Sequence, residues 1–190
     1  MKRNLICILV LAFVLFIGAA SVLPSNTDTG EKSEKDSSSK EKPAKLTWYK
    51  YDEGLIKAKK EKKHIMVHFY TTWCGWCKRM DQNTFNDEEI KKVLDESYVP
   101  IRVNGQSGQK LKLDGKEVSE RQLTAQYGVR AYPITWFLKP SGERIAPRRG
   151  YAGPDEFLYI LNWVKDDLYE KISFQEFVKK EEDKKKPKKK

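Results

Sequence analysis

Two cysteines follow a strand-length run of apolar residues, and this junction constrains the fold more than any other feature. Residues 65–70 (Ile-Met-Val-His-Phe-Tyr) are near-continuously apolar, which is typical of a strand covered on both faces. Cys74 and Cys77 come after a short turn. In a helical first turn such a pair has Cα atoms about 5–6 Å apart, within the range that a disulfide tolerates. The sequence therefore predicts a buried strand leading into a helix that opens with a cysteine pair.

Strand and helix patterns alternate along residues 46–178, which we interpret as one domain. After a basic helix and the apolar strand, further strands are predicted at 99–103, 135–138 and 143–147, the last two as a hairpin. Pro154 opens a long helix whose apolar residues recur at helical spacing. This order predicts an α/β fold, with a mixed central sheet, helices on both faces and a C-terminal helical extension.

Three helices have clear start signals, each a capping box or close variant with a hydrophobic staple around it. The predicted starts are Asn86 with Glu89, Ser119 with Gln122, and Ser173 with Glu176. Gly128 suits the end of the second of these helices. Residues 105–116 contain an Asp-Gly turn and are expected to form a hairpin insertion that either contacts a partner or elaborates the surface.

The N-terminal segment has the features of export. Residues 1–24 combine two basic residues with an apolar run that reaches Leu23, so they form a cleaved signal peptide or a single membrane anchor. Either outcome places the protein in the periplasm or at the outer face of the cytoplasmic membrane. Residues 25–45 are rich in Ser, Lys, Glu and Asp, and we expect them to form a flexible polar linker.

The net charge of +10 is concentrated at the C-terminus. Residues 179–190 carry eight lysines against three acidic side chains, whereas residues 46–178 carry 22 basic and 19 acidic side chains. The nearly balanced domain argues against a nucleic-acid partner. We expect the tail to be disordered, and its lysines are candidates for contact with anionic lipid headgroups.

The chemistry is predicted at Cys74 and Cys77. A purely structural disulfide is disfavoured, because closing so short a loop contributes only about 2 kcal/mol. At a helix start, unsatisfied N–H groups and the helix dipole favour the Cys74 thiolate. Cys77 lies one turn further in, is expected to be more buried, and would resolve a mixed disulfide by attacking Cys74. Lys78 either supports the thiolate or is a solvated helix residue.

A metal-binding module that uses the cysteine pair is an alternative of another class. Structural zinc requires four ligands, and the domain offers His64 and His68 besides the two cysteines. On an extended run these histidines lie about 13 Å apart, so they cannot easily converge with the cysteines. We therefore predict no metal ligands and no cofactor beyond the redox-active disulfide. A pure interaction domain is a third alternative.

Two motifs resemble those of the thioredoxin family. Residues 73–78 (Trp-Cys-Gly-Trp-Cys-Lys), after 67–70, resemble a thioredoxin active site, and residues 128–134 (Gly-Val-Arg-Ala-Tyr-Pro-Ile) resemble the family's cis-proline loop. Residues 150–157 and 173–177 are similar to exported bacterial thioredoxin-like proteins associated with sulfur oxidation.

The resemblance covers roughly residues 50–170 and implies a thioredoxin fold with roles for single residues. Cys74 would be the nucleophile and Cys77 the resolving thiol, while Trp73 would shield the site. A cis Pro133 would place the backbone of Tyr132 to pair with an extended substrate segment. The substrate-binding residues that this implies are Trp73, Gly75, Trp76, Tyr132 and Pro133.

The sequence departs from the family pattern at two positions. Trp76 stands where the family usually has proline, so the redox potential cannot be carried over. His68 stands where the family usually has a buried aspartate that accepts the proton of the resolving cysteine. A histidine with a pKa near 6.5 could do the same at neutral pH, or it could be satisfied within the sheet and have no role.

These features predict an exported enzyme, a monomeric thiol–disulfide oxidoreductase with protein disulfide or dithiol substrates. In the reducing direction it would take electrons from a membrane thiol transporter, as thioredoxin-like proteins of this kind commonly do. Disulfide formation or isomerisation is the alternative, because the direction depends on the potential relative to the compartment.

Overall fold

The structure is a computed structural model that describes residues 46–185. The segments predicted as a signal peptide or anchor (1–24) and as a linker (25–45) lie outside the described residues. Within residues 46–185, none of the helices is long and apolar enough to cross a membrane.

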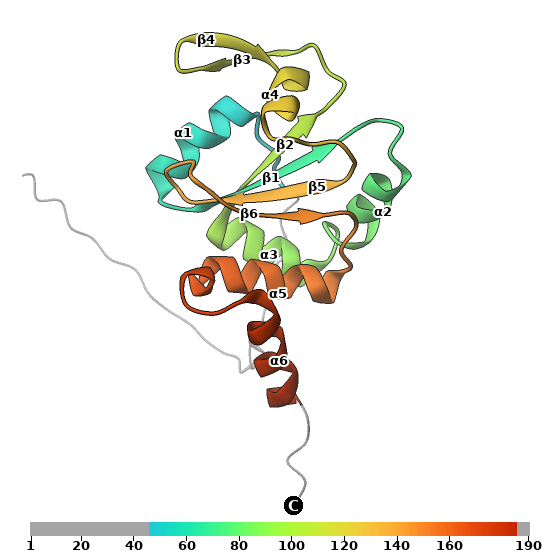
Figure 1. Ribbon diagram of the computed structural model, residues 1–190, viewed down its shortest axis with the longest axis vertical. Coiled ribbons are helices and arrows are strands. Elements are labelled where there is room, and N and C mark those ends of the chain that lie inside the picture. Colours follow the sequence, from blue (N-terminus) through green and yellow to red (C-terminus); the bar gives the residue numbers. More distant parts are fainter. Residues whose placement is uncertain (1–45, 186–190) are drawn as a thin grey trace, which may run out of the picture. The chain divides into compact units, whose positions relative to one another are not determined.

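A mixed four-stranded sheet forms the centre of the domain (Figure 1). Its strands, in order across the sheet, are β2 (Tyr98–Asn104), β1 (His64–Tyr70), β5 (Ile134–Leu138) and β6 (Arg144–Arg149). β1 pairs in parallel with β2 and antiparallel with β5, and β6 closes the predicted hairpin with β5. The predicted strands are therefore confirmed, and β1 is hydrogen-bonded along both edges.

Helices cover both faces of this sheet, which confirms the predicted α/β architecture. One face packs against α1 (Tyr51–Glu61) and α4 (Glu120–Gln126), and the other against α3 (Glu88–Ser97) and α5 (Pro154–Lys165) (Figure 1). Alternation along β1 sends Ile65, Val67 and Phe69 into the first core and Met66 into the second. Two separate cores thus enclose one buried strand.

The predicted hairpin insertion is confirmed and lies outside the main sheet. β3 (Lys110–Leu113) and β4 (Lys116–Ser119) pair around Asp114 and Gly115, whose φ angles are 49° and 75°. These are the positive angles that a two-residue hairpin turn of this kind requires. The backbone N–H of Lys112 donates to Asp52 of α1 at 3.0 Å, which ties the hairpin to the domain.

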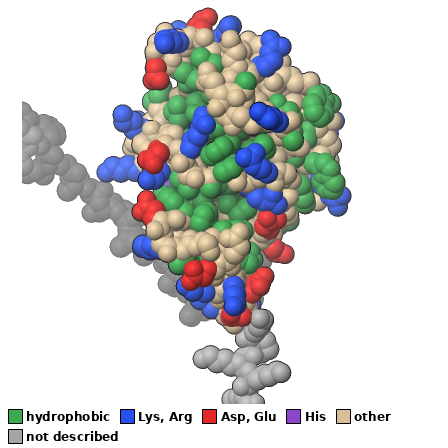
Figure 2. All heavy atoms as spheres, in the orientation of Figure 1, with side chains coloured by type: hydrophobic (Ala, Val, Ile, Leu, Met, Phe, Trp, Pro, Cys, Tyr) green, Lys and Arg blue, Asp and Glu red, His purple; other side chains and the backbone are tan. Residues whose placement is uncertain are grey.

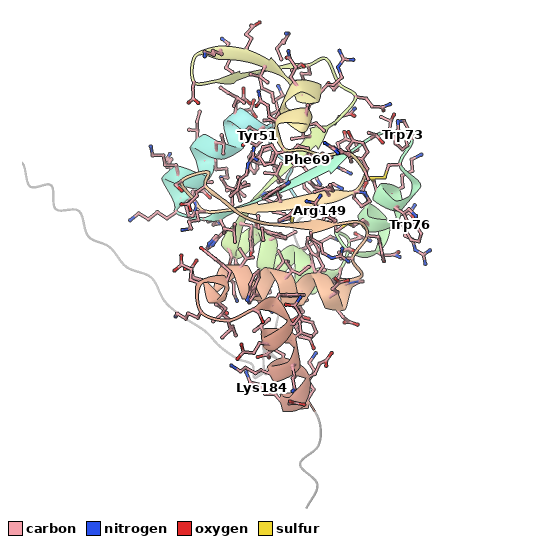
Figure 3. All side chains as sticks on the ribbon, viewed as in Figure 1. Tyr51, Phe69, Trp73, Trp76, Arg149 and Lys184 are labelled. Atoms are coloured by element: carbon pink, nitrogen blue, oxygen red, sulfur yellow. A yellow bond between two sulfur atoms is a disulfide. The ribbon has the colours of Figure 1, made fainter. Side chains whose placement is uncertain are left out.

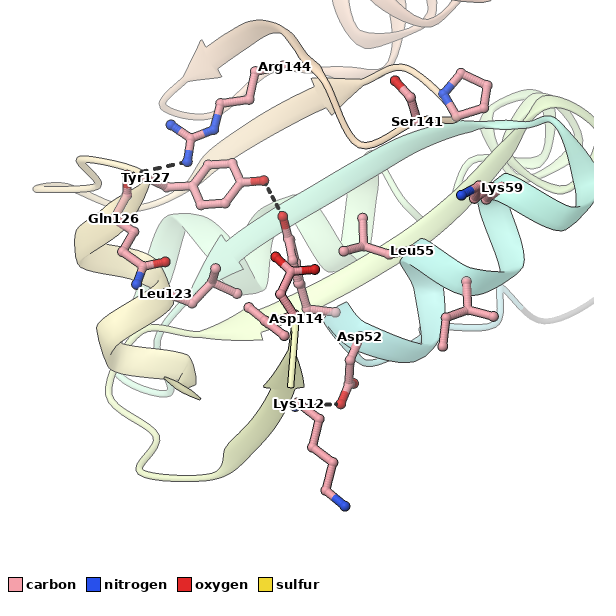
Figure 4. Close-up of a pocket in the computed structure, with 14 residues that line it drawn as sticks. Asp52, Leu55, Lys59, Lys112, Asp114, Leu123, Gln126, Tyr127, Ser141 and Arg144 are labelled. Atoms are coloured by element: carbon pink, nitrogen blue, oxygen red, sulfur yellow. Dashed lines mark hydrogen bonds between the residues drawn. The ribbon is translucent and has the colours of Figure 1, made fainter. Parts of the chain in front are cut away.

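A hollow of about 430 Å³ lies between this hairpin, α1, α4 and the turn before β6 (Figure 4). The hydroxyl groups of Tyr51 and Tyr127 share a hydrogen bond of 2.5 Å, and the guanidinium group of Arg144 lies 3.8 Å from the Tyr127 ring centre. In Figure 2, Lys and Arg side chains border hydrophobic surface on the face in view. The hairpin therefore forms a wall of a surface hollow.

The start signals were correct for two of the three helices. Ser119 and Gln122 form a complete capping box, and the Glu176 N–H donates to Ser173 at 3.2 Å. The prediction for Asn86 is wrong, because Asp87 caps α3 by accepting from two backbone N–H groups at 3.0 Å each. A carboxylate interacts more favourably than an amide with the positive end of the helix.

The prediction that the disordered tail begins at residue 179 is also wrong. A 3₁₀ turn (Leu168–Glu170) leads to α6 (Phe174–Lys185). Phe177 is buried against Tyr159 of α5, and the ion pair Glu176–Lys180 (2.9 Å) bridges the predicted boundary. One apolar anchor and helical ion pairs therefore extend the ordered chain to Lys185. Residues 186–190 lie outside the described range.

Phe177→Ala tests how α6 is held. We expect the substitution to lower the free energy of unfolding by about 3 kcal/mol, because it removes a buried aromatic side chain. Lys184→Ala, at a side chain that is 71% exposed, should change it by less than about 0.5 kcal/mol. Urea unfolding of both variants measures the difference, and equal stabilities would mean that α6 is not anchored by Phe177.

Candidate active site

The disulfide lies at the junction of β1 and α2 (Gly75–Asn83) (Figure 3). Cys74 is the N-cap residue of α2 and is bonded to Cys77, with Cα atoms 5.3 Å apart. The predicted helix start and spacing are both confirmed. The backbone N–H of Cys77 donates to Cys74 Sγ at 3.1 Å. A donor aimed at this sulfur from a helix N-terminus favours its thiolate in the reduced state.

Burial differs little between the two cysteines but strongly between them and the flanking tryptophans. Cys74 and Cys77 are 4% and 1% exposed, so the expected difference in burial between them is small. Trp73 and Trp76 are 65% and 56% exposed and lie beside the disulfide (Figure 3). Among the described residues, the only other exposed large hydrophobic side chain is Ile56. The side chains of Trp73 and Trp76 are thus exposed to solvent next to the reactive sulfurs.

The predicted substrate-binding residues come together at this end of the sheet. Trp76, Tyr132 and Pro133 line a hollow of about 360 Å³, together with Gly150 and Tyr151. The ring of Trp73 meets that of Tyr132 edge-on at 5.9 Å, and Trp76 meets Tyr151 at 5.5 Å. The peptide bond between Tyr132 and Pro133 is cis. The hollow is therefore formed by three segments that are separated in the sequence.

Gly105 and Tyr151 are site residues that the sequence reasoning did not identify. A Cβ atom at Gly105 would lie 2.0 Å from the Tyr132 hydroxyl, so only glycine allows the tyrosine to occupy this place. A glycine directly after the second strand was the available signal. Gly75 has open space around it, and Lys78 is exposed, its side chain free of ion pairs within residues 46–185.

His68 is fully buried on the face of β1 that lies toward α2. Its Nδ1 is 3.1 Å from the Thr135 hydroxyl, and Nε2 has no hydrogen-bond partner among the described residues. Burial, and next the positive charge of Arg102, lower the pKa of His68 to about 3. The expected pKa near 6.5 is therefore wrong, and the side chain is neutral at physiological pH.

Arg102 of β2 is a partly buried charged residue that the sequence reasoning missed. Its Nη2 donates to both carboxylate oxygens of Asp81 on α2, at 2.7 and 2.6 Å. Its guanidinium carbon lies 5.0 Å from the ring centre of Trp48 and 4.4 Å from that of Tyr70. An arginine within an otherwise apolar strand, and an aspartate one turn after Cys77, were the signals available.

Comparison with known proteins agrees with this geometry. The model of the thioredoxin-like domain family matches residues 51–165. Protein disulfide-isomerase of Oryctolagus cuniculus is 35% identical over 103 residues, which are 54% of this chain and 18% of that protein. The chain thus spans less than a fifth of the length of this and other protein disulfide-isomerases that it matches.

Solved structures share the architecture. A thioredoxin of Thermus thermophilus has a TM-score of 0.53 and 25% identity, over 64% of this chain and 88% of that one. A putative disulphide-isomerase of Bacteroides thetaiotaomicron has a TM-score of 0.50 and 28% identity, over 67% and 93%. The predicted thioredoxin fold is confirmed. With its disulfide at the start of α2 and its family match over residues 51–165, the chain belongs to the thioredoxin-like domain family.

Proposed function

We propose that this protein is an exported thiol–disulfide oxidoreductase that reduces protein disulfides outside the cytoplasmic membrane, with electrons from a membrane thiol transporter. The observation that carries the proposal is the disulfide at the start of α2, with Trp73 and Trp76 exposed beside it and a hollow lined by Tyr132 and Pro133. A reactive disulfide, exposed aromatic side chains and an adjoining hollow together suit an extended peptide that carries a disulfide.

The reaction follows from the order of the two sulfurs. In the reduced protein the Cys74 thiolate attacks a substrate disulfide; a mixed disulfide forms, and the first substrate sulfur leaves as a thiolate. The Cys77 thiol loses its proton to solvent and attacks Cys74. The Cys74–Cys77 bond forms as the bond to the substrate breaks, and the second substrate sulfur leaves with the electron pair and takes up a proton. Two electrons have then passed from the protein to the substrate.

Disulfide formation or isomerisation is the second candidate, and the similarity to protein disulfide-isomerases favours it. The same two sulfurs support both directions, because the direction depends on the reduction potential relative to that of the compartment. A reducing role requires reduction by a partner after each turnover. The membrane thiol transporter that we propose as this partner would be needed only in that case.

Export is proposed from residues 1–24, which combine basic and apolar residues. The place of this protein among exported thioredoxin-like proteins associated with sulfur oxidation is likewise a proposal, as are its monomeric state, the lack of a nucleic-acid partner and the contact of its basic tail with anionic lipids. Fractionation of cells that produce the full chain would test export, and recovery in the cytoplasm would contradict it.

A metal-binding role remains the alternative of another class. Across residues 46–185, no group of three or more His, Cys, Asp or Glu side chains is placed to hold a metal ion. His64 lies against Asp167 at 3.1 Å and His68 against Thr135, so neither is directed to the disulfide by its contacts. Elemental analysis that found one tightly bound metal per chain, without disulfide reduction, would favour this alternative.

Cys77→Ser tests the order of attack. We expect this variant to accumulate disulfide-linked partners, because Cys74 can attack but nothing resolves the product. Cys74→Ser should trap none, since the backbone donor that favours a thiolate at the helix start is directed at Cys74 Sγ and not at Cys77. Non-reducing electrophoresis and mass spectrometry of the captured proteins measure the outcome. Equal trapping by both variants would contradict the assignment of Cys74 as the nucleophile.

A redox titration against glutathione tests the direction. We expect a potential below about −230 mV for a reductase, whereas an isomerase lies near −180 mV. Alkylation of free thiols at each ratio of reduced to oxidised glutathione measures the dithiol fraction. A value near that of isomerases would exclude the reducing role in favour of the second candidate.

His68→Asn tests the effect of the buried histidine on stability. The pKa of about 3 in the folded protein lies below the ordinary value of about 6.5, so between these values the unfolded chain binds more protons. Wild-type stability is therefore complete above pH 6.5 and falls as the pH drops, by up to about 1.4 kcal/mol per pH unit. We expect His68→Asn to lack this dependence in urea unfolding at pH 7, 6 and 5.

The same variant tests a role of His68 in proton transfer. A base with so low a pKa accepts few protons at neutral pH, so we expect the pH dependence of mixed-disulfide resolution to be unchanged in His68→Asn. Quenched-flow measurement of resolution between pH 5 and 9 is the test. A displaced profile would restore His68 to the mechanism.

A further inference from the structure

A row of polar side chains crosses the sheet on the face toward α2 and α5. His68 of β1 is in register with Arg102 of β2 on one side and Thr135 of β5 on the other, and Thr135 is in register with Arg148 of β6. Residues in register on neighbouring strands point to the same face. The four side chains therefore form a polar row across a face of the sheet on which other residues, such as Met66, enter the apolar core.

Each end of this row connects the sheet to a helix by an ion pair. Arg102 donates to both oxygens of Asp81 on α2, and Arg148 Nε donates to Glu156 on α5 at 2.8 Å. Both are arginine–carboxylate pairs, but one reaches α2 and the other reaches α5. Of these two helices, α2 is the one that begins at Cys74 and contains Cys77.

The environment of Arg102 restricts its guanidinium group to one position. The aromatic rings of Trp48 and Tyr70 lie within 5.0 Å of the guanidinium carbon. Its side chain is 25% exposed, and that of Asp81 is 36% exposed, so water screens the pair only in part. Arg102 Nε and His68 Nε2 are buried without a hydrogen-bond partner in the described part of the chain. The hydrogen bonds of the Arg102 guanidinium group go to the Asp81 carboxylate through Nη2.

Asp81 occupies the position one turn after Cys77 on α2. Residues four apart on a helix lie on the same side, with Cβ atoms about 5–6 Å apart. A carboxylate at this distance opposes the appearance of a second negative charge on the Cys77 sulfur. Resolution of the mixed disulfide needs that charge, because the thiolate attacks and the thiol does not.

We propose that Arg102 is a positioning residue for the resolution step: it neutralises Asp81 beside Cys77 and holds α2 against the sheet, so that the Cys77 thiolate can form at neutral pH. This inference rests on the proposed thiol–disulfide exchange. It names Arg102 as a residue that sets the pH dependence of the resolution step. Arg102 touches neither the substrate nor the sulfurs, and it acts through Asp81.

The other charged groups of this region do not replace Arg102. On α2, Lys78 is exposed, and Arg79 lies over the rings of Trp76 and Tyr151 at 5.5 and 5.9 Å, on the substrate side. On β1, His68 is neutral and Tyr70 stacks on Arg102. The balance of charge behind Cys77 therefore depends on Arg102 and Asp81.

Single-turnover oxidation of the reduced full-length protein by oxidised glutathione tests the proposal. Acid quenching and mass spectrometry count the mixed disulfide with time, which separates attack by Cys74 from resolution by Cys77, and the series is repeated between pH 5 and 9. For Arg102→Met we expect the pH at half-maximal resolution to rise by about one unit, a roughly tenfold loss of rate at low pH. For Asp81→Asn we expect it to fall.

Two further variants separate charge from structure. Arg102→Lys keeps the cation, so we expect a midpoint close to that of the wild type. Arg102→Met with Asp81→Asn removes both charges, and we expect the midpoint to return toward the wild-type value even if the protein is less stable. A residue with a merely structural role would lower the melting temperature and leave all these midpoints in place.

Arg148→Met is the matched control, because it breaks the equivalent ion pair at the other end of the row. Its partner Glu156 lies on α5, so no carboxylate is left unpaired beside Cys77, and the midpoint should not move. Midpoints that coincide in Arg102→Met, Asp81→Asn and wild type would overturn the proposal. Failure of oxidised glutathione to convert the reduced wild type to the Cys74–Cys77 disulfide would instead contradict the proposed exchange reaction, so the two failures are distinguishable.

Discussion

The pairing of β1 along both edges is the constraint on which the rest of the structure depends. Parallel pairing with β2 and antiparallel pairing with β5 enclose residues 65–69 of this strand along both edges, and its apolar side chains supply both cores. A strand enclosed in this way cannot move relative to the sheet without breaking hydrogen bonds in a dry interior. The segment that follows β1 therefore starts from a fixed position. The disulfide at the beginning of α2 is held in place for the same reason.

The disulfide lies between the rigid strand β1 and a solvent-exposed aromatic surface. The cysteines are almost fully buried, while the tryptophans on either side are more than half exposed. Glycine at position 105 lets Tyr132 approach from another loop, so the aromatic surface around the sulfurs comes from distant parts of the chain. A substrate would meet a preformed apolar surface and a sulfur whose thiolate is stabilised by a backbone donor. This combination supports exchange with protein disulfides rather than a structural crosslink.

Local patterns were enough to predict most of the elements. Alternation and length located the strands, and capping boxes located two helix starts, because both signals are contained within a few neighbouring residues. One of the two errors has a local cause, and the other depends on a distant contact. Asp87 competes successfully with Asn86 for the same N–H groups. The single apolar residue Phe177 in a charged segment gave little sign that it docks on Tyr159, since docking depends on a partner that lies elsewhere in the chain.

The sequence by itself determined the order of strands and helices, the position of the cysteine pair at a helix start and the family to which these motifs point. Only the tertiary structure decided the electrostatics behind that pair. The register of β1 and β2 brings Arg102 beside His68, and packing of α2 brings Asp81 onto Arg102. Burial then lowers the pKa of His68 far from the value that its residue type suggests. Charge and desolvation depend on neighbours distant in the sequence, so a pattern read along the chain cannot contain them.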